Sequence, residues 1–495
     1  MRTETDALGA VRIPKRALYG IQSRRARDNF ALAEYRPVNL NLVRAMAKVK
    51  KAAALTHAEL EPGRAAVFNA VAAAADAVLD GAAAEMFIVP ALQGGAGTST
   101  NMNVNEVLAN LALVGLGFEP GNYARVHPID DVNRGQSTND VYPTALRIAA
   151  VDLLRELSEE AASLQEALQR RENELQDVVK LGRTELMDAV PVTLGGEFGA
   201  WAQAVARDRW RLYKMEERLR QVNIGGTAVG LSPLSERRYR FGVIERLREI
   251  CGIGLAASEY PMDVTQNNDV FCEVSGLLKA LAVNLAKIAG DLRLMGSGPA
   301  GGLGEIRLAP LQMGSTFMPG KVNPVVPELA LSASMKVMAN DLAVTVAASR
   351  GEFELNAFLP VIAEALLESL EILRDVTRIF RVRCIETLAP DPERCRALLE
   401  GSMAFAAAYW PQLGYERVAA AVRLAEGDPA RAREALEAAL KAGCGPDAPG
   451  GADLPGVQGE PDEVQGEPGG GRGEPDGVQG EPGGGQGGPG VGQGD

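Results

Sequence analysis

The chain has 495 residues, 46% of them hydrophobic and 23% charged, and a formal net charge of −13 at pH 7. This length exceeds what a single hydrophobic core supports and predicts two or three domains. Its five cysteines are scattered and never form a CxxC pair, and it has only two histidines, so the composition excludes a disulfide framework, a zinc cluster and a His-rich metal site.

The sequence also indicates the compartment in which the protein works. No uninterrupted run of about 18 apolar residues is present to span a membrane, and the N-terminus MRTETDALGA has no apolar h-region of a signal peptide. No basic stripe interleaved with aromatic residues indicates a nucleic-acid surface. We therefore expect a cytoplasmic protein, with no nucleic acid and no membrane as its partner.

Long helices dominate the expected secondary structure, because Ala, Leu, Glu and Arg are abundant and β-branched runs are short. Between 139 and 180 there is no Gly and apolar residues recur near heptad spacing. A helix of that length, roughly 60 Å at 1.5 Å per residue, needs neighbouring helices along its whole length. The pattern therefore predicts a helical bundle with contacts between subunits. We expect further long helices over 197–221 and 265–295, and another with Asn323 as its N-cap and Pro324 at the first helical position.

These elements divide the chain into four parts. We predict an N-terminal domain over residues 1–136, a central long-helix domain over 137–389, a small helical domain over 390–442, and a disordered acidic tail over 443–495. The tail repeats V-Q-G-E-P and has no aromatic residue, so it cannot bury enough apolar surface to offset the entropy of ordering. We interpret the tail as a solvated segment, with partner binding as the alternative.

Four polar, glycine-rich segments interrupt the helices at 94–103, 135–140, 182–185 and 314–324. Free backbone N–H groups where a helix begins attract carboxylates, although a hydroxyl or amide before a helix is more often only a cap. The fourth segment, GSTFMPGKVNP, is not explained as a cap, because its Lys lies between Gly/Pro pairs six residues after a hydroxyl pair. Such a segment is typical of a mobile lid that carries reactive groups.

The fourth segment resembles the GSSxMPxKxNP signature of the aspartase/fumarase superfamily. Three other segments agree with that family in the same order: GGAGTSTNMNVNEVLAN, VNRGQSTNDVYPT and GRTELMDAVPVTLG. The motifs are more similar to the aspartase branch than to class II fumarases, whose pattern has a His where this chain has Glu185. The resemblance covers about Asp6 to Tyr415 and implies an all-α, three-domain fold with a central twenty-helix bundle in a homotetramer, whose active sites each draw loops from three subunits.

The resemblance also implies a reaction, the reversible elimination of ammonia from L-aspartate to give fumarate. Ser315 matches the catalytic base that removes a proton next to a carboxylate, and Lys321, supported by Asn323, matches the group that binds a substrate carboxylate. A serine is too weakly acidic for this role unless the loop stabilises its alkoxide. The other substrate-binding residues implied are Thr98, Ser99, Ser137, Thr138, Asn139, Thr184 and Glu185.

Two departures from the family pattern bear on the substrate. Glu185 stands where relatives carry Gln or His, and an ionised carboxylate there would repel a substrate carboxylate. Burial beside another anion would instead keep it protonated, or it could pair with an ammonium group. Leu231-Ser232-Pro233 stands where the family has TGLN, so a different substituted succinate is an alternative substrate.

Two other functions therefore stay open. The first is a fumarase or another lyase that acts on a substituted succinate. The second is a non-catalytic scaffold that works through its tail, although Ser315 and Lys321, which would decay first in such a descendant, are intact. The implied chemistry requires no cofactor, and no carboxylate cluster in the sequence identifies a divalent activator, so no metal ligands are predicted.

Overall fold

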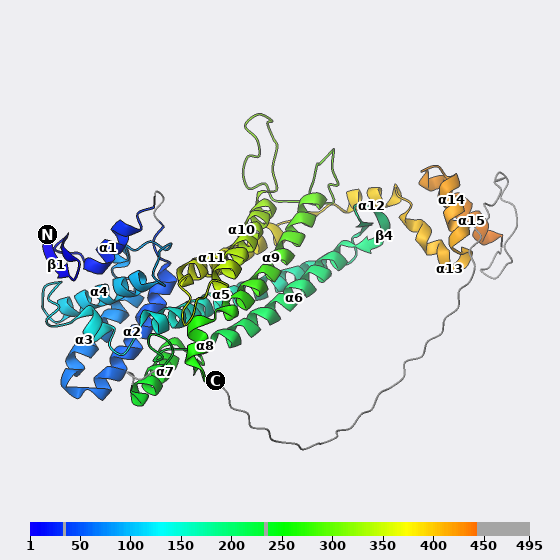
Figure 1. Ribbon diagram of the computed structural model, residues 1–495. Coiled ribbons are helices and arrows are strands. Elements are labelled where there is room, and N and C mark those ends of the chain that lie inside the picture. The colour runs from blue at the N-terminus through cyan, green and yellow to red at the C-terminus, as the bar shows by residue number, and fades with distance from the viewer. Residues whose placement is uncertain (33–35, 232–235, 443–495) are drawn as a thin grey trace, which may run out of the picture.

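The computed structural model describes residues 1–32, 36–231 and 236–442, so the tail predicted at 443–495 lies outside the described residues. Figure 1 shows an elongated molecule in which long helices run side by side, with the N-terminal elements at one end and the last helices at the other. Helices make up most of the described chain, and short two-stranded sheets are added to them. The expectation of an all-α fold is therefore confirmed.

The N-terminal end is a helical layer flanked by a hairpin that the sequence analysis missed. Strands β1 (Arg2–Asp6) and β2 (Gly9–Ile13) pair antiparallel. The helices that follow are α1 (Ile21–Asn29), α2 (Leu40–Leu60), α3 (Ala65–Leu79) and α4 (Thr98–Gly115). The alanine-rich helices α2 and α3 pack closely against each other, since small side chains let two helix axes approach.

The bundle consists of five long helices, and the last of them, over 359–380, was not predicted from the sequence. Its long members are α5 (Thr138–Glu174), α6 (Leu194–Leu219), α9 (Asp269–Met295), α10 (Val325–Ala348) and α11 (Leu359–Phe380). Helix α5 begins with a capping box, in which the Ser137 hydroxyl accepts from Asn139 N at 3.2 Å and the Asp140 carboxylate accepts from Ser137 N at 2.9 Å. It ends at Glu174, before the predicted limit at 180, because the chain turns there into a strand.

Two local expectations were wrong. Helix α10 begins at Val325, its N-cap is Pro324, and no side chain caps it, because the Asn323 amide donates instead to Gly314 O at 2.8 Å. The segment 182–185 is not a loop before a helix. It lies in strand β3 (Val179–Thr184) and at the tip of the hairpin that β3 forms with β4 (Met187–Thr193). Glycine and polar residues in this segment favour a loop, but antiparallel hydrogen bonding with residues 187–193 makes it part of a strand.

The smaller elements complete the chain. The remaining strands are β5 (Gln221–Val222), β6 (Ala256–Ala257), β7 (Ile306–Arg307) and β8 (Ala389–Pro390). The remaining α-helices are α7 (Arg237–Cys251), α8 (Pro261–Gln266), α12 (Pro392–Glu400), α13 (Trp410–Leu413), α14 (Tyr415–Leu424) and α15 (Pro429–Lys441). Short 3-10 or π-helical turns lie between them: η1 (Pro62–Arg64), η2 (Ala84–Met86), η3 (Pro128–Val132), η4 (Arg381–Ile385) and η5 (Ala404–Tyr409).

One continuous hydrophobic core joins the N-terminal helices to the bundle. Buried residues from Val38 to Leu388 form a single cluster, and a separate small cluster under η5 and helices α13–α15 includes Leu413 and Leu436. The division at residues 136, 389 and 442 stays a prediction. Among the described residues, one helix, α10, is long and apolar enough to cross a membrane, a test that core helices of soluble proteins also pass.

Candidate active site

The first two predicted segments meet in the structure. Asn101, in the first turn of α4, is buried, and its amide donates to Thr138 Oγ1 and to Asn133 Oδ1, each at 3.1 Å. These bonds tie the start of α4 to the start of α5. Thr98 is the first residue of α4 and is exposed, while Ser99 is half-buried. Thr98 N already donates to Gly95 O at 2.9 Å and Thr100 N to Gln93 Oε1 at 3.2 Å, so the hydroxyls of Thr98 and Ser99 are the groups that this positive helix end offers a carboxylate.

At the start of α5, the candidate residues already have partners within the chain. The Ser137 hydroxyl accepts the capping bond, Thr138 is buried, and the Asn139 amide donates to Ala228 O at 2.7 Å. Each keeps capacity to spare, since a hydroxyl that accepts one bond can still donate and an amide has a second N–H. The bond to Ala228 also connects α5 to a glycine-rich turn.

The third segment is a strained hairpin tip. Glu185 and Leu186 form the two-residue turn between β3 and β4, and their φ angles are +53° and +66°. This left-handed region suits glycine and costs other residues about 1–2 kcal/mol each. Both side chains are exposed in the single chain, as is Thr184. Strain of this kind gathers at functional sites, which supports a role for the tip.

A buried carboxylate anchors this hairpin. Glu305 is fully buried, and its two oxygens lie 2.8 Å from Arg183 Nη1 and 3.0 Å from Lys180 Nζ. Lys180, also buried, bonds Glu197 at 2.9 Å. Because Arg183 directly precedes Thr184, the pair fixes the strand that carries the candidate residues against the segment that leads into β7. No local sequence pattern singles out Glu305, which lies between a glycine-rich segment and the short strand β7 (Ile306–Arg307).

The fourth segment carries the arrangement most suggestive of chemistry. Ser315 Oγ accepts from the backbone N–H groups of Phe317 at 3.1 Å and Met318 at 2.8 Å. Gly314 N donates to Lys321 O at 2.8 Å and closes the loop. Two fixed donors aimed at one oxygen favour its anionic form. Ser315 and Lys321 line the same hollow of about 260 Å³.

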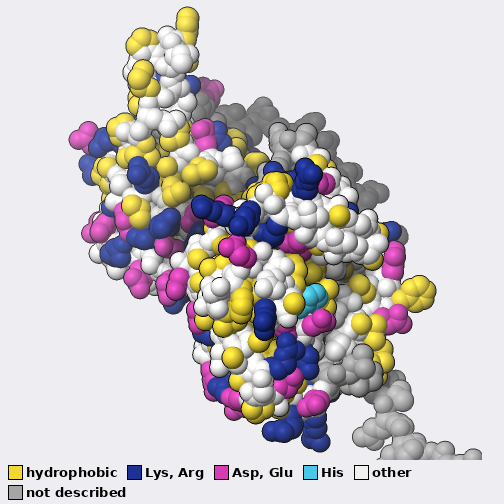
Figure 2. Space-filling view, turned by 90° about the vertical axis from the view of Figure 1, so that its left-hand side faces the viewer, with side chains coloured by type: hydrophobic (Ala, Val, Ile, Leu, Met, Phe, Trp, Pro, Cys, Tyr) yellow, Lys and Arg dark blue, Asp and Glu magenta, His cyan; other side chains and the backbone are white. Residues whose placement is uncertain are grey.

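This loop stands away from the body of the molecule. It rises above the start of α10 in Figure 1, and Figure 2 shows hydrophobic side chains on the projecting part. Met313 and Phe317 are 87% and 89% exposed. Large apolar side chains exposed together mark a surface that another molecule covers.

Within one chain, the four segments occupy three separate places. The starts of α4 and α5 lie together, the β3–β4 hairpin lies at the far end of the bundle beside α12, and the loop above α10 is distinct from both (Figure 1). The loop with Ser315 and Lys321 therefore does not lie beside the segments with Thr98 and Thr184 in the single chain. On the face drawn in Figure 2, basic and acidic side chains are interspersed.

Two buried ionisable residues near the α5 start were not singled out from the sequence. Asp140 accepts three backbone N–H bonds, and burial raises its pKa to about 7. Lys50 on α2 donates to Asn133 Oδ1 at 2.8 Å, and burial lowers its pKa to about 7. The Ser-x-x-Asp spacing is a capping signal that could have identified Asp140. Lys50, in an alanine-rich helix, carries no comparable signal.

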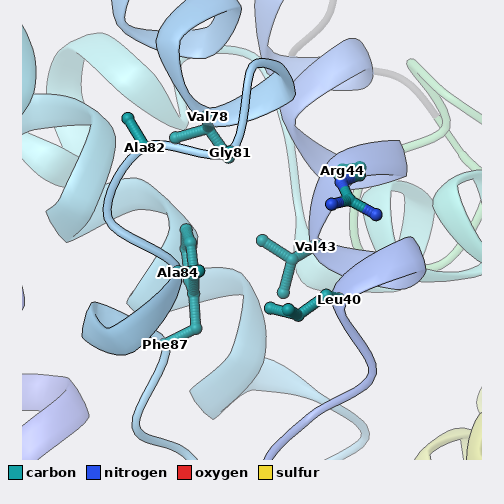
Figure 3. Close-up of a pocket in the computed structure, with 8 residues that line it drawn as sticks. All are labelled: Leu40, Val43, Arg44, Val78, Gly81, Ala82, Ala84 and Phe87. Atoms are coloured by element: carbon teal, nitrogen blue, oxygen red, sulfur yellow. The ribbon is translucent and has the colours of Figure 1, made fainter.

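A small hollow between α2 and the segment after α3 is a packing defect rather than a site. Its volume is about 10 Å³, room for at most one water. Figure 3 shows Leu40 and Val43 of α2 opposite Ala84 and Phe87. The complete lining is Leu40, Val43, Arg44, Val78, Gly81, Ala82, Ala84 and Phe87.

Among the described residues, no group of three or more His, Cys, Asp or Glu could hold a metal ion.

Comparison with known proteins identifies relatives that match most of this chain. An aspartate ammonia-lyase from a Bacillus species is 42% identical over 423 residues, which cover 86% of this chain and 90% of that protein. Those of Bacillus subtilis and Escherichia coli are each 40% identical, over 85% and 84% of this chain and 89% and 87% of their own lengths.

Solved structures of two lyases share the fold of this chain. A protein from Brucella melitensis, described as fumarate lyase:delta crystallin and bound to cobalt, is 42% identical with a TM-score of 0.83, covering 89% of this chain and 99% of its own. A class II fumarase from Schistosoma mansoni has the same TM-score at 28% identity, covering 88% and 95%. Residues 9–339 match the family model described as Lyase. The chain therefore belongs to this lyase family, the aspartase/fumarase superfamily.

Proposed function

We propose that the protein is an ammonia-lyase, a carbon–nitrogen lyase that converts L-aspartate to fumarate and ammonia. The observation that carries the proposal is the Ser315 oxygen, which accepts two backbone N–H bonds in a loop that also holds Lys321. Relatives 40–42% identical over most of the chain, all aspartate ammonia-lyases, support this substrate. The class II fumarase at 28% identity is a more distant match.

The loop would supply the base and a cation. Ser315, as an alkoxide stabilised by the N–H groups of Phe317 and Met318, takes the proton from the carbon next to a carboxylate. The electron pair left behind first adds charge to that carboxylate. Lys321 offsets this charge, and its effect rises when closure removes water. The C–N bond then breaks, which gives fumarate and releases ammonia.

The helix starts would bind the remaining polar groups of the substrate. Thr98 and Ser99 lie at the start of α4, where their hydroxyls would donate to a carboxylate and the positive end of the helix favours its charge. Ser137, Thr138 and Asn139 lie beside them through the Asn101 bond. Thr184 and Glu185 would come from the hairpin tip of another subunit, and Asn323 joins the two ends of the loop through its bond to Gly314 O.

We also infer a homotetramer in which subunits complete one another's sites. Exposed apolar side chains on α10 recur near heptad spacing at Leu329, Met335, Leu342 and Val346, as expected where another helix packs. The separation of the candidate segments within one chain supports the same arrangement. Leu342→Glu should lower the mass measured by light scattering from about four subunits to fewer; an unchanged tetramer would contradict this packing face.

We further expect catalysis without a cofactor and a cytoplasmic location. The cysteines Cys251, Cys272, Cys384 and Cys395 are free thiols, which suits a reducing compartment. Activity that persists after dialysis against a chelator would support the cofactor-free reaction, and activity regained only on adding a divalent cation would reveal an activator.

The assay follows the ultraviolet absorbance of fumarate with purified protein and either L-aspartate or L-malate. We expect fumarate from L-aspartate only, and a loss of about 10²–10⁴ in kcat for Ser315→Ala. Ser158→Ala, midway along α5, is the matched control and should keep wild-type activity. Fumarate from L-malate alone would favour the fumarase alternative. Full activity of Ser315→Ala would remove Ser315 from its role.

A further inference from the structure

Asp140 is a buried carboxylate beside the proposed substrate-binding residues at the start of α5, although it faces the protein interior. We propose that Asp140 is a positioning residue that holds the substrate-binding start of α5 against the turn at 223–228, with Lys50 supporting it from α2. This inference rests on the proposed function, because that function assigns Ser137, Thr138 and Asn139 to substrate binding.

Three backbone bonds converge on Asp140. One oxygen accepts from Ser137 N at 2.9 Å, and the other accepts from Gly225 N at 3.0 Å and Thr227 N at 2.9 Å. The side chain is fully buried. A helix cap needs only the first of these bonds. The other two connect α5 to a turn more than 80 residues further along the chain.

The turn needs this support because part of its backbone is strained. Thr227 has a φ of +58°, in a left-handed region that β-branched residues avoid because the backbone is strained there. Asp140 accepts the N–H of this same residue. The buried carboxylate therefore stabilises a conformation that the turn would not keep alone.

Other bonds show what the strained turn positions. Ala228 O accepts from the Asn139 amide at 2.7 Å, and the Asn223 amide donates to Asn139 O at 3.0 Å and to Thr265 Oγ1 at 2.9 Å. Asn139 is thus held by the turn at both its backbone and its side chain. If the turn relaxed, the Asn139 amide would lose its fixed direction toward the substrate.

Lys50 and Tyr239 are the titratable groups that face Asp140 from the neighbouring helices α2 and α7. Lys50 acts through charge rather than a direct bond, since its ammonium donates to Asn133 Oδ1 at 2.8 Å. The same oxygen accepts from Asn101 and Asn105 on α4. Lys50 therefore supports the junction of α4 and α5 as well as the charge on Asp140.

The arrangement makes the positioning sensitive to pH. Burial raises the pKa of Asp140 to about 7, opposed by its three hydrogen bonds and by Lys50. Above that pH the carboxylate accepts all three N–H groups. Below it a protonated oxygen would face an N–H donor, so the turn would loosen and activity would fall.

The first test combines kinetics with a matched control. For Asp140→Asn we expect kcat/KM with L-aspartate to fall roughly 100-fold, as for a small misplacement of binding groups, and the decline in activity below about pH 7 to disappear. Lys50→Met should move this decline to higher pH, because the charge that favours the carboxylate is lost. Asp208→Asn, a buried carboxylate on α6 that is bonded by Asn284, should leave the profile unchanged.

The second test does not depend on turnover. Deuterium uptake of the peptide that covers 223–230 in the full-length protein should accelerate in Asp140→Asn and stay as in wild type in Asp208→Asn. Adding Thr227→Gly, which removes the strain, should restore part of the protection and part of the activity. If wild type releases no fumarate from L-aspartate, the proposed function fails, and the exchange data still decide the role of Asp140. Unchanged uptake in Asp140→Asn, or no rescue by Thr227→Gly, would overturn the inference.

Discussion

Two glycines in the loop before α4 allow a controlled test of how this loop is built. Gly97 and Gly95 have similar left-handed φ angles, +89° and +85°. A Cβ on Gly97 would lie 2.2 and 2.3 Å from ring carbons of Tyr142, which is buried in the core, whereas a Cβ on Gly95 would meet nothing within 4 Å. The two positions therefore share backbone strain and differ in steric overlap.

We expect Gly95→Ala to cost about 1–2 kcal/mol, the strain of an alanine in this region. Gly97→Ala adds the cost of overpacking, about 1–3 kcal/mol, and should lower the free energy of unfolding by about 2–5 kcal/mol. Urea unfolding followed by circular dichroism measures both. Because Thr98 directly follows Gly97, kcat/KM should also fall more in Gly97→Ala than in Gly95→Ala. Equal destabilisation by the two substitutions would refute the steric argument.

Three further predictions concern stability. Leu186→Gly should raise the free energy of unfolding by about 1 kcal/mol, because it relieves a left-handed residue whose side chain is 74% exposed; a lower denaturation midpoint would contradict this. Glu305→Leu should lower the free energy of unfolding by about 3–5 kcal/mol, since Lys180 and Arg183 lose a buried partner. The control Glu393→Gln, on α12, should change this free energy little in the same urea titration. Arg155, helped by Arg220, lowers the pKa of Glu216 to about 2 from its usual 4.5, so this carboxylate stabilises the fold above pH 4.5 and loses that contribution as the pH falls toward 2. Arg155→Met should therefore flatten the loss of stability over this range in acid titrations, and an unchanged slope would show that the pair contributes nothing.

The sequence predicted the long helices well, because each carries its own periodicity and end signals. Helix α5 begins where the helix over 139–180 was predicted and ends six residues earlier, and the helix over 197–221 agrees with α6 to within a few residues. Non-local pairing was harder to predict. The β3–β4 hairpin has a Glu-Leu turn rather than the glycine-containing turn that usually identifies such a hairpin, so its partner strand was not recognised.

The candidate site shows the same limit. Motif resemblance singled out Ser315 and Lys321, and their roles stay predictions. It passed over Glu305 and Lys50, because nothing in their local sequence indicates burial. Glu305 becomes informative only once Lys180 and Arg183, more than 120 residues earlier, lie beside it. Sequence reasoning identifies groups that act through a motif, while groups that act by positioning others appear only in three dimensions.

The continuous core affects how the chain folds while it is being synthesised. Helix α5 packs along α11, and roughly 185 residues separate the end of the first from the start of the second. At the usual elongation rate a ribosome needs about 10–40 s to make that stretch. Throughout this interval the apolar face of α5 cannot pack against α11, because α11 has not yet been synthesised. The nascent chain is therefore a natural client for chaperones, and slowing translation should increase its aggregation more than slow refolding of the finished chain does.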